Sequence, residues 1–379
     1  MDNPFVIGGY GGPEYFCDRE KETEQMVRYL TNGNNIVLSS PRRIGKTDLI
    51  SHVLSQPTIR DEYITIQIDI YSTRSFAEMV SMLGKAIAKA LLPLGHALVR
   101  NFVGFLGSLR SQISFDISGM PTWSVGVGEW KAPETTLAEI FEYLDKAPRP
   151  VIVAIDEFQQ ITKYKDAWKV EALLRTHIQH CRNANFIYAG SQRHLMAEMF
   201  LSPARPFYSS STLMGLPLLD QKVYGDFCQE MFRRYDKTLD PQVPEKLYKK
   251  FKGITAYMHR VMNELFALTP KGGLCHAADI DKAIQNFLDS ANDGFTALTY
   301  QLSERQMALL LAIAREGEAR NIQSGAFIKK HKLLSSGSVL SGAKTLLDRD
   351  IITREGDIYS VYDQFYALWL LRTYGEYGS

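Results

Sequence analysis

The segment from Ser40 to Asp48 combines small, basic and hydroxyl side chains at a spacing that suits phosphate binding. It follows the apolar run NIVLSS (35–40) and leads into DLISHVL (48–54), which can continue as a helix. A loop between a strand and a helix N-terminus presents backbone N–H groups to an anion, which is the context of the motif G-x-x-x-x-G-K-[ST]. The expected phosphate-binding residues are Ser40, Pro41, Arg42, Arg43, Ile44, Gly45, Lys46, Thr47 and Asp48.

Several side chains of this segment have separate expected roles. Lys46 should reach the β- and γ-phosphate oxygens, and the Thr47 hydroxyl should ligate Mg²⁺. Gly45 lets the backbone approach the anion closely. Ser40 stands where the motif has its first glycine, so the sequence departs from the pattern there. A chance Gly-Lys-Thr after a strand is the alternative, and a second motif argues against it.

That second motif is VIVAIDE (151–157), in which five apolar residues predict a buried central strand that ends at Asp156 and Glu157. Ligands of open α/β sheets bind at the carboxyl ends of the strands. We expect Asp156 to hold Mg²⁺ opposite Thr47. We expect Glu157 to act as the catalytic base that orients and polarises an attacking water. On its own, the acidic pair could also be a solvated strand end.

A third run, NFIYAGS (185–191), predicts a strand that ends near these carboxylates. A polar residue at its tip can hydrogen-bond the γ-phosphate or the attacking water. Gln192 has the longer reach and is the first candidate for this catalytic role, and Ser191 is the second. A plain turn at the end of the strand is the alternative.

The apolar periodicity also predicts the elements that must position these residues. Four β-rich runs between about 35 and 190, including YITIQIDI (63–70), alternate with helical patterns. This alternation predicts an α/β fold with a mainly parallel sheet covered on both faces. The run 102–130 breaks the rhythm with ISFDIS and WSVGVG around a Gly/Pro turn, and it is predicted to be an inserted hairpin.

The remainder of the chain predicts two further parts. Three helical patterns between about 220 and 297 indicate a small helical lid domain. From about Leu302, three helices precede IITREGDIYSVYD (351–363), which looks like two strands around a turn, and this order describes a winged helix-turn-helix. The predicted domains are therefore 1–218 for the core, 219–298 for the lid and 299–379 for the winged helix.

Composition restricts the partners and the compartment. The 43 Lys and Arg residues nearly balance the 42 Asp and Glu residues, so no global charge draws the chain to nucleic acid or to an anionic membrane. The four cysteines are widely spaced, which argues against a zinc site or a disulfide framework. The sequence contains neither a secretory signal pattern nor an apolar run long enough to span a membrane. We therefore expect no membrane partner and a cytoplasmic location.

Together these motifs, with PEYFCDREKETEQM (13–26), GSQ (190–192) and YSVYDQFYALWL (359–370), resemble the prokaryotic P-loop ATPases of the STAND and AAA-like (ASCE) group. The resemblance covers nearly the whole chain. It implies a P-loop NTPase core followed by a helical lid and a winged helix. It also implies ATP as the nucleotide, Mg²⁺ as the cofactor and ATP hydrolysis as the activity.

The resemblance extends to two aromatic residues and one arginine. Tyr15 and Phe16 precede the Arg-Glu box, whose neighbours help to seat adenine in this family, although an aromatic residue before a helix is usually a packing contact. Arg205 lies in ARPFYSS (204–210), where relatives place a basic residue. The family relationship implies that Arg205 could act as an arginine finger toward a second copy of the chain. A solvated loop arginine is the alternative.

The lid departs from the family pattern. STAND relatives have a Gly-x-Pro motif that contacts nucleotide, whereas this chain has Gly253-Ile254-Thr255-Ala256 without a proline. Whether His259 or Arg260 on the following helix senses phosphate is therefore open, with a core or surface role as the alternative.

The motifs predict the phosphate chemistry in detail, but they say less about the process that this chemistry drives. The first hypothesis is an ATP-dependent molecular switch that moves the lid and the winged helix and exposes a surface for a protein partner or a second copy. The alternative is a DNA-binding protein in which ATP adjusts the winged helix. The expected recognition helix, 336–349, offers few of the Asn, Gln and Arg side chains that read base edges. A winged helix that only packs is a third interpretation.

Overall fold

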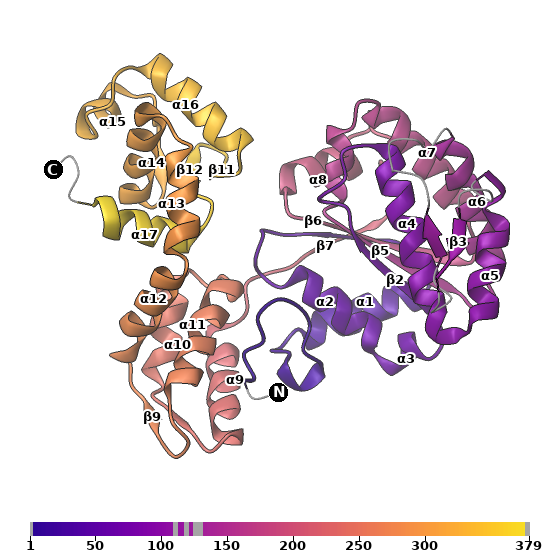
Figure 1. Cartoon of the computed structure of the whole chain (residues 1–379), viewed down its shortest axis with the longest axis horizontal. Coiled ribbons are helices and arrows are strands. Elements are labelled where there is room, and N and C mark those ends of the chain that lie inside the picture. The colour runs from indigo at the N-terminus through magenta and orange to yellow at the C-terminus, as the bar shows by residue number, and fades with distance from the viewer. Residues whose placement is uncertain (1–2, 109–112, 117–120, 124–131, 376–379) are drawn as a thin grey trace. The chain divides into compact units, whose positions relative to one another are not determined.

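The computed structural model describes residues 3–108, 113–116, 121–123 and 132–375. The chain divides into two compact units, one formed by residues 8–224 and the other by residues 1–7 together with 225–379 (Figure 1). Each unit has its own hydrophobic core, and each is described separately below. No helix that the structure describes has the length and apolar character needed to cross a membrane.

Unit 8–224 is built on a parallel sheet of five strands in the order β2-β5-β6-β1-β7. Four strands match the predicted runs: β1 (Ile36–Ser39), β2 (Ile64–Asp69), β5 (Val151–Asp156) and β6 (Ala184–Gly190). The fifth, β7 (Thr212–Gly215), was not predicted, because it is short and pairs at the edge beside β1. Every residue of β5 is buried, as an apolar run at the centre of a sheet requires. The α/β fold with a parallel sheet is thus confirmed.

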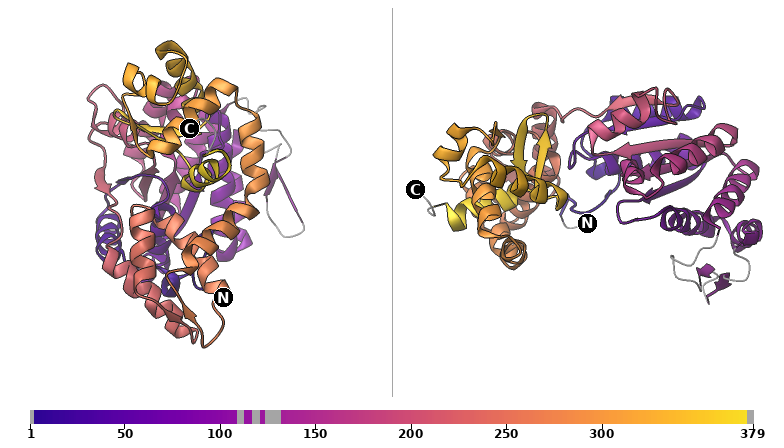
Figure 2. Two further views of the ribbon diagram at one scale, coloured as in Figure 1. Left: turned by 90° about the vertical axis from the view of Figure 1, so that its left-hand side faces the viewer. Right: turned by 90° about the horizontal axis from the view of Figure 1, so that it is seen from above.

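Helices cover both faces of this sheet, and the right-hand view of Figure 2 shows the strands between them. One face packs against α1 (Glu20–Thr31), α2 (Lys46–Ser55) and α3 (Pro57–Arg60) through a cluster that includes Met26, Leu49 and Ile152. The other face packs against helices that follow β2, β5 and β6 in the chain. These helices are α4 (Phe76–Leu91), α5 (His96–Phe105), α6 (Pro133–Lys146), α7 (Ala167–His180) and α8 (Arg193–Leu201).

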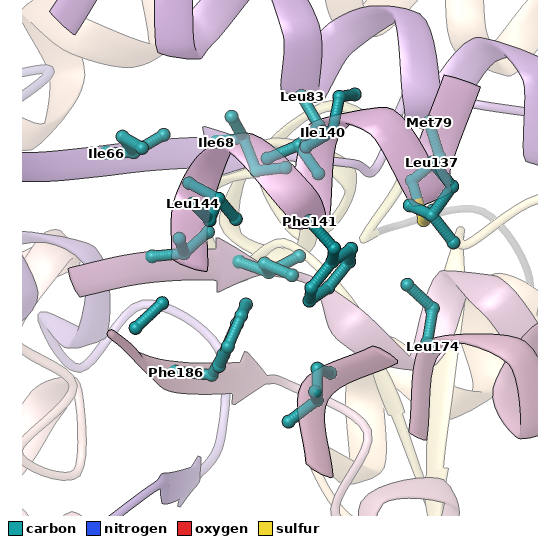
Figure 3. Packing of buried hydrophobic residues seen from close by; sticks show 14 of the residues in the cluster. Ile66, Ile68, Met79, Leu83, Leu137, Ile140, Phe141, Leu144, Leu174 and Phe186 are labelled. Atoms are coloured by element: carbon teal, nitrogen blue, oxygen red, sulfur yellow. The ribbon is translucent and has the colours of Figure 1, made fainter. Parts of the chain in front are cut away.

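The second face has an aromatic and aliphatic core that fixes the position of β5. Leu137, Ile140, Phe141 and Leu144 project from α6 toward the sheet (Figure 3). Phe141 stacks on Phe186 of β6, with ring centroids 5.8 Å apart. Because both faces of β5 are packed in this way, its carboxyl end has a fixed place in the fold.

Short elements complete this unit. They are the 3₁₀ helices η1 (Pro13–Tyr15), η2 (Leu92–Leu94) and η5 (Phe158–Lys163), and an antiparallel pair β3 (Ile113–Phe115) and β4 (Pro121–Trp123). The strand pair lies within the predicted hairpin 102–130. However, residues 102–105 are the end of α5, and residues 109–112, 117–120 and 124–130 of that prediction lie outside the described residues.

The second unit, residues 1–7 with 225–379, contains the three predicted helices α9 (Gln221–Arg234), α10 (Gln242–Lys250) and α11 (Thr255–Leu268). The first turn of α9 lies before residue 225 and therefore belongs to the other unit. The three helices are followed by α12 (Asp279–Ser290) and α13 (Asn292–Tyr300), and a small parallel pair, β8 (Thr238–Leu239) with β9 (Leu274–Cys275), links the loops. The predicted helical region is therefore present.

The winged helix follows in the predicted order. Its helices are α14 (Glu304–Glu316), α15 (Gly325–Lys330) and α16 (Ser336–Asp348), and its wing is β11 (Ile352–Glu355) with β12 (Ile358–Val361). A short strand, β10 (Ala319–Arg320), pairs with the other side of β12. A final helix, α17 (Gln364–Tyr374), was not predicted as a separate element. Its Trp369 is buried and donates a hydrogen bond from Nε1 to Asn292 Oδ1 at 3.0 Å.

The packing differs from the three predicted domains at two places. Residues 1–7 were predicted to belong to the core domain 1–218, but Phe5 is fully buried among Phe227, Phe232 and Phe266 of the other unit. The chain leaves unit 8–224 after Tyr224 rather than at 218. The boundary predicted between 298 and 299 lies inside one compact unit and stays a prediction.

Candidate functional site

The loop after β1 has the backbone geometry that a phosphate-binding loop requires. Gly45 has φ 90° and ψ 26°, a left-handed conformation that glycine adopts without strain, and it is the N-cap of α2. Ser40, which stands in place of the first glycine of the motif, is 1 % exposed, and its N–H donates to Gly190 O at 3.3 Å. The Ser40 position therefore continues the β1–β6 pairing, and the turn comes after it.

The side chains of the loop divide between core and surface. Ile44 is buried in the core and anchors the loop, while Pro41 is exposed and Arg43 is half-buried.

Two titratable side chains at the start of α2 have shifted pKa values. Asp48 lies in the first turn of α2, where burial raises the pKa of its carboxyl group. Lys46 is 6 % exposed. Burial lowers the pKa of the Lys46 ammonium group, while the nearby Asp156 and Glu157 carboxylates act in the opposite direction.

The structure brings Thr47 and Asp156 together. The Thr47 hydroxyl donates a hydrogen bond to Asp156 Oδ2 at 2.5 Å, and the backbone N–H of Glu157 donates to Asp156 Oδ1 at 2.9 Å. A hydroxyl and a carboxylate are oxygen donors of the kind that Mg²⁺ prefers, and Mg²⁺ usually completes its shell with phosphate and water oxygens. These two residues therefore fit the predicted ion. No group of three or more His, Cys, Asp or Glu side chains within the described ranges forms a cation site from protein ligands alone.

Glu157 follows the end of β5 in a left-handed backbone conformation, with φ 54° and ψ 40°. Ser191 Oγ donates a hydrogen bond to Glu157 Oε2 at 2.7 Å, and the side-chain amide of Gln159 donates to the same oxygen. Ser191 Oγ in turn accepts a hydrogen bond from Arg42 Nε at 2.8 Å. The phosphate loop, the acidic strand end and the tip of β6 are thus joined by hydrogen bonds.

At the tip of β6 it is Ser191, the second candidate, that contacts the acidic pair. Ser191 is buried, whereas Gln192 is half-buried and is the N-cap residue of α8. The hydrogen bonds described above for Glu157 do not include Gln192. Its predicted role with the γ-phosphate stays a prediction that requires bound nucleotide.

Two further residues of the site were missed by the sequence reasoning. Asp69 ends β2 directly opposite Asp156 in the parallel register. Burial and the charges of Asp156 and Glu157 raise the pKa of its carboxyl group, although a hydrogen bond from the Tyr71 N–H opposes the shift. Its place at the end of YITIQIDI, a predicted strand, was a usable signal. Gln159 carried no such signal, because a glutamine two residues after a strand is common in loops.

Arg205 has an intramolecular partner. Its Nη2 donates to Glu171 Oε1 of α7 at 2.5 Å, and its Nη1 lies 3.5 Å from Glu198 Oε1. Glu171 is fully buried and Arg205 is 19 % exposed. The residue is therefore not a plain solvated arginine, since it compensates a buried carboxylate within its own unit. Action toward a second copy stays a prediction.

The aromatic residues near the N-terminus are in packing contacts. Phe16 stacks on the His52 ring of α2 at a centroid distance of 4.2 Å. The Tyr10 hydroxyl is 2.7 Å from His52 Nδ1, and Tyr15 ends η1. Through this stack, the segment before α1 packs against α2, the helix that follows the phosphate loop. A contact of Tyr15 or Phe16 with adenine stays a prediction.

In the other unit, His259 is a core residue. Burial lowers the pKa of its imidazole to about 4, and its ring lies 5.3 Å from the Phe5 ring. Arg260 lies over the Phe287 ring at 5.1 Å. These contacts agree with the structural alternative for both residues.

Comparison with known proteins gives the same architecture. Residues 16–261 match the profile of the ATPase domain found predominantly in Archaea, and residues 293–372 match a probable winged helix domain. An uncharacterised ATP-binding protein of Methanocaldococcus jannaschii is 25 % identical over 163 residues, which is 40 % of this chain and 44 % of that protein. The chain therefore aligns with less than half of that relative's length.

Solved structures share the fold across both units. A Walker-type ATPase of Pyrococcus abyssi has a TM-score of 0.65 at 19 % identity, covering 97 % of this chain and 99 % of its own. The ORC2 protein of Aeropyrum pernix, in ADPNP and ADP complexes, has a TM-score of 0.61 at 13 % identity, covering 98 % and 96 %. The ORC1 protein of the same organism, in complex with DNA, has a TM-score of 0.53 at 13 % identity, covering 95 % and 94 %.

The family match covers more than half of the chain, and it includes the phosphate loop, the acidic strand end and the tip of β6. The chain therefore belongs to the ATPase domain family found predominantly in Archaea, a family of P-loop nucleotide-binding proteins, and it carries a C-terminal winged helix domain.

Proposed function

We propose that the chain binds ATP together with Mg²⁺ and hydrolyses it to ADP and phosphate. The observation that carries this proposal is the hydrogen bond from Thr47 Oγ1 to Asp156 Oδ2, 2.5 Å long. This contact joins a hydroxyl of the phosphate loop to a carboxylate of the acidic strand end, and it supports the proposal that both oxygens ligate the ion. Mg²⁺, when bound there, would neutralise charge on the phosphate oxygens.

The remaining side chains supply binding and proton transfer. Lys46 lies buried at the N-terminus of α2, so its ammonium group and the N–H groups of the first turn attract phosphate oxygens in a low-dielectric site. Glu157 orients a water for attack on the γ-phosphorus and accepts its proton, as the bond from the γ-phosphorus to the bridging oxygen breaks and ADP leaves.

The role of Asp156 can be tested by varying Mg²⁺. Asp156→Ala should weaken binding of Mg·ATP and reduce turnover, because the ion contacts the nucleotide both in the bound state and in the transition state. In the wild type, chelation of Mg²⁺ by EDTA should weaken ATP binding. In Asp156→Ala the same treatment should have little further effect. Equal sensitivity of both proteins to EDTA would remove Asp156 from the ion site.

For the process that ATP binding and hydrolysis drive, we propose a molecular switch. In this switch the nucleotide state moves the helical region and the winged helix and exposes a surface for a partner. Support comes from the division of the chain into two units, with Gly8, Gly9 and Gly12 in left-handed conformations in the segment after residue 7. Glu157→Gln protein, trapped with ATP, should differ in hydrodynamic size from the same protein with ADP. An identical size in both states would contradict the switch.

A second copy is one proposed partner. If Arg205 acts in trans, specific ATPase activity should rise with protein concentration, and a mixture of Arg205→Lys and Glu157→Gln proteins should recover activity that neither has alone. The lysine variant is chosen because it keeps a cation beside the buried Glu171. Concentration-independent activity without recovery would leave Arg205 with its intramolecular contact only.

DNA is the alternative partner, and the winged helix is the feature that favours it. The ORC1 protein with which this chain shares its fold was solved in complex with DNA. In this chain, the exposed part of α16 carries Ser341 and Lys344 but also Leu340, which is 54 % exposed. Binding of a labelled duplex by the wild type that is weakened by Lys344→Ala would support the DNA role. The absence of binding at low salt would exclude it.

A further inference from the structure

Gln159 lies in the candidate site, where its side-chain hydrogen bonds go to Glu157 and Ser191 and not to the predicted phosphate-binding or Mg²⁺-binding residues. Its side chain is 2 % exposed and projects from η5, the helix that begins directly after Glu157. Its amide nitrogen donates a hydrogen bond to Glu157 Oε2 and lies 3.5 Å from Ser191 Oγ. The buried amide is therefore directed at the predicted catalytic base.

Burying the Gln159 amide lowers the stability of the fold, which argues that the amide is there to bind the Glu157 carboxylate. Within the described part of the chain, Gln159 Oε1 is buried and has no hydrogen-bond partner. A buried oxygen of this kind destabilises a fold, whereas an apolar side chain of similar volume would not. The amide can face the carboxylate only through its nitrogen, so Oε1 must point elsewhere.

The surroundings leave the Gln159 amide little freedom. A Cβ atom at Gly190 would lie 2.5 Å from Gln159 Oε1 and 2.4 Å from Met196 Sδ, so the tip of β6 needs a glycine to admit the glutamine. Thr162 Oγ1 donates a hydrogen bond to the Gln159 carbonyl at 2.8 Å, which holds its backbone. The amide is thus fixed before any nucleotide binds.

Both donors to Glu157 use the same oxygen. Ser191 and Gln159 hold Oε2 from β6 and from η5, so Oε1 is the oxygen available to a water. A carboxylate held at one oxygen by two donors from different elements has a fixed plane, which is the preorganisation that general-base catalysis requires.

We propose that Gln159 is a positioning residue for ATP hydrolysis: its amide, together with the Ser191 hydroxyl, fixes the Glu157 carboxylate with Oε1 directed to the attacking water. This inference rests on the proposed function, because it assigns Glu157 the role of base. It adds a residue that acts through Glu157 and not on the nucleotide.

The test replaces the amide by a side chain of similar length that cannot donate a hydrogen bond. Gln159→Met should lower the single-turnover hydrolysis rate by about 10- to 100-fold, the cost typical of a misplaced catalytic group. Its ATP affinity should stay within about twofold of the wild type. Its melting temperature should be unchanged or higher, since the unpaired Oε1 is removed. A residue with only a structural role would give the opposite pattern, with lower stability and a normal rate.

Gln160→Met is the matched control. Gln160 is the next residue of the same 3₁₀ helix and donates from its amide to the Thr73 carbonyl at 2.8 Å, away from Glu157. This variant should hydrolyse ATP at the wild-type rate. If Gln159→Met does not fold, Gln159→Ala removes the same donor without adding volume and should show the same loss of rate. An equal loss in Gln160→Met would refute a specific role for Gln159.

A double-mutant cycle separates this inference from the proposed function. In the Glu157→Gln background, Gln159→Met should cause no further loss, because the base it positions is already absent. If Glu157→Gln is slow but Gln159→Met hydrolyses ATP within twofold of the wild type, the inference fails and the proposed function stands. If Glu157→Gln itself turns over at the wild-type rate, the proposed function fails, and the inference fails with it.

Discussion

The ion pair between Arg205 and Glu171 gives a prediction in which stability depends on pH. Glu171 of α7 is fully buried, and Arg205 Nη2 lies 2.5 Å from its Oε1. Burial raises the pKa of Glu171 to about 7, although the Arg205 charge opposes this. We therefore consider Arg205→Ala, which removes the cation and leaves the buried carboxyl group in place.

The magnitude follows from the shift in pKa. Because the folded pKa of Glu171 lies above its ordinary value of 4.5, this group lowers the stability of the wild type as the pH rises from about 4.5 to 7, and not beyond. Without Arg205 the pKa rises further, so the loss continues above pH 7 at up to about 1.4 kcal/mol per pH unit. Between pH 7 and pH 9 the variant should lose up to about 2.7 kcal/mol relative to the wild type, within the range for breaking a buried ion pair.

Urea unfolding of both proteins at pH 6, 7, 8 and 9 measures this difference. Lys169→Ala is the control, because Lys169 lies on α7 like Glu171 but forms an exposed ion pair, with Glu134 of α6, and its loss should change stability little at every pH. A stability difference between Arg205→Ala and the wild type that does not change from pH 6 to pH 9 would refute the assignment of a raised pKa to Glu171.

Three further predictions concern binding, packing and the tip of β6. Lys46→Ala should weaken ATP binding tenfold or more in a calorimetric titration, because a charge-assisted contact contributes about 1.5–3 kcal/mol; unchanged affinity would contradict the phosphate-loop assignment. Phe5→Ala should destabilise its unit by about 3–5 kcal/mol in scanning calorimetry, whereas Ile7→Ala, at a residue 39 % exposed, should have little effect. Gly190→Ala should cost about 1–3 kcal/mol through overpacking against Met196 and should also slow hydrolysis; wild-type stability and rate would contradict the close approach.

The parts of the fold that could be predicted from the sequence are those where local pattern and tertiary environment agree. β5 is apolar from Val151 to Ile155 because both its faces are buried, and α2 begins where Gly45 ends the loop. β7 and α17 were missed for the opposite reason. β7 has only four residues at a sheet edge, and the aromatic residues of α17 show their role only when they meet α13.

The same distinction holds for the candidate site: some of its residues could be predicted from the local sequence pattern and others could not. Gly45, Lys46, Thr47 and the acidic pair follow from spacing, because phosphate and Mg²⁺ binding restrict residue type at fixed intervals. Contacts between distant segments have no such spacing. The salt bridge from Arg205 to Glu171 joins residues 34 apart in the chain, and only the packing of the loop after α8 against α7 brings them together.

The central claim is that Glu157 activates water while the phosphate loop binds nucleotide, and hydrolysis by Glu157→Gln protein tests it most directly. We predict that ATP affinity stays near the wild-type value, while the single-turnover rate falls by roughly 10²- to 10⁴-fold, as expected for the loss of a general base. The amide keeps the size of the side chain and removes only its ability to accept a proton from water. Hydrolysis at the wild-type rate would contradict the account and leave Glu157 without the role of catalytic base.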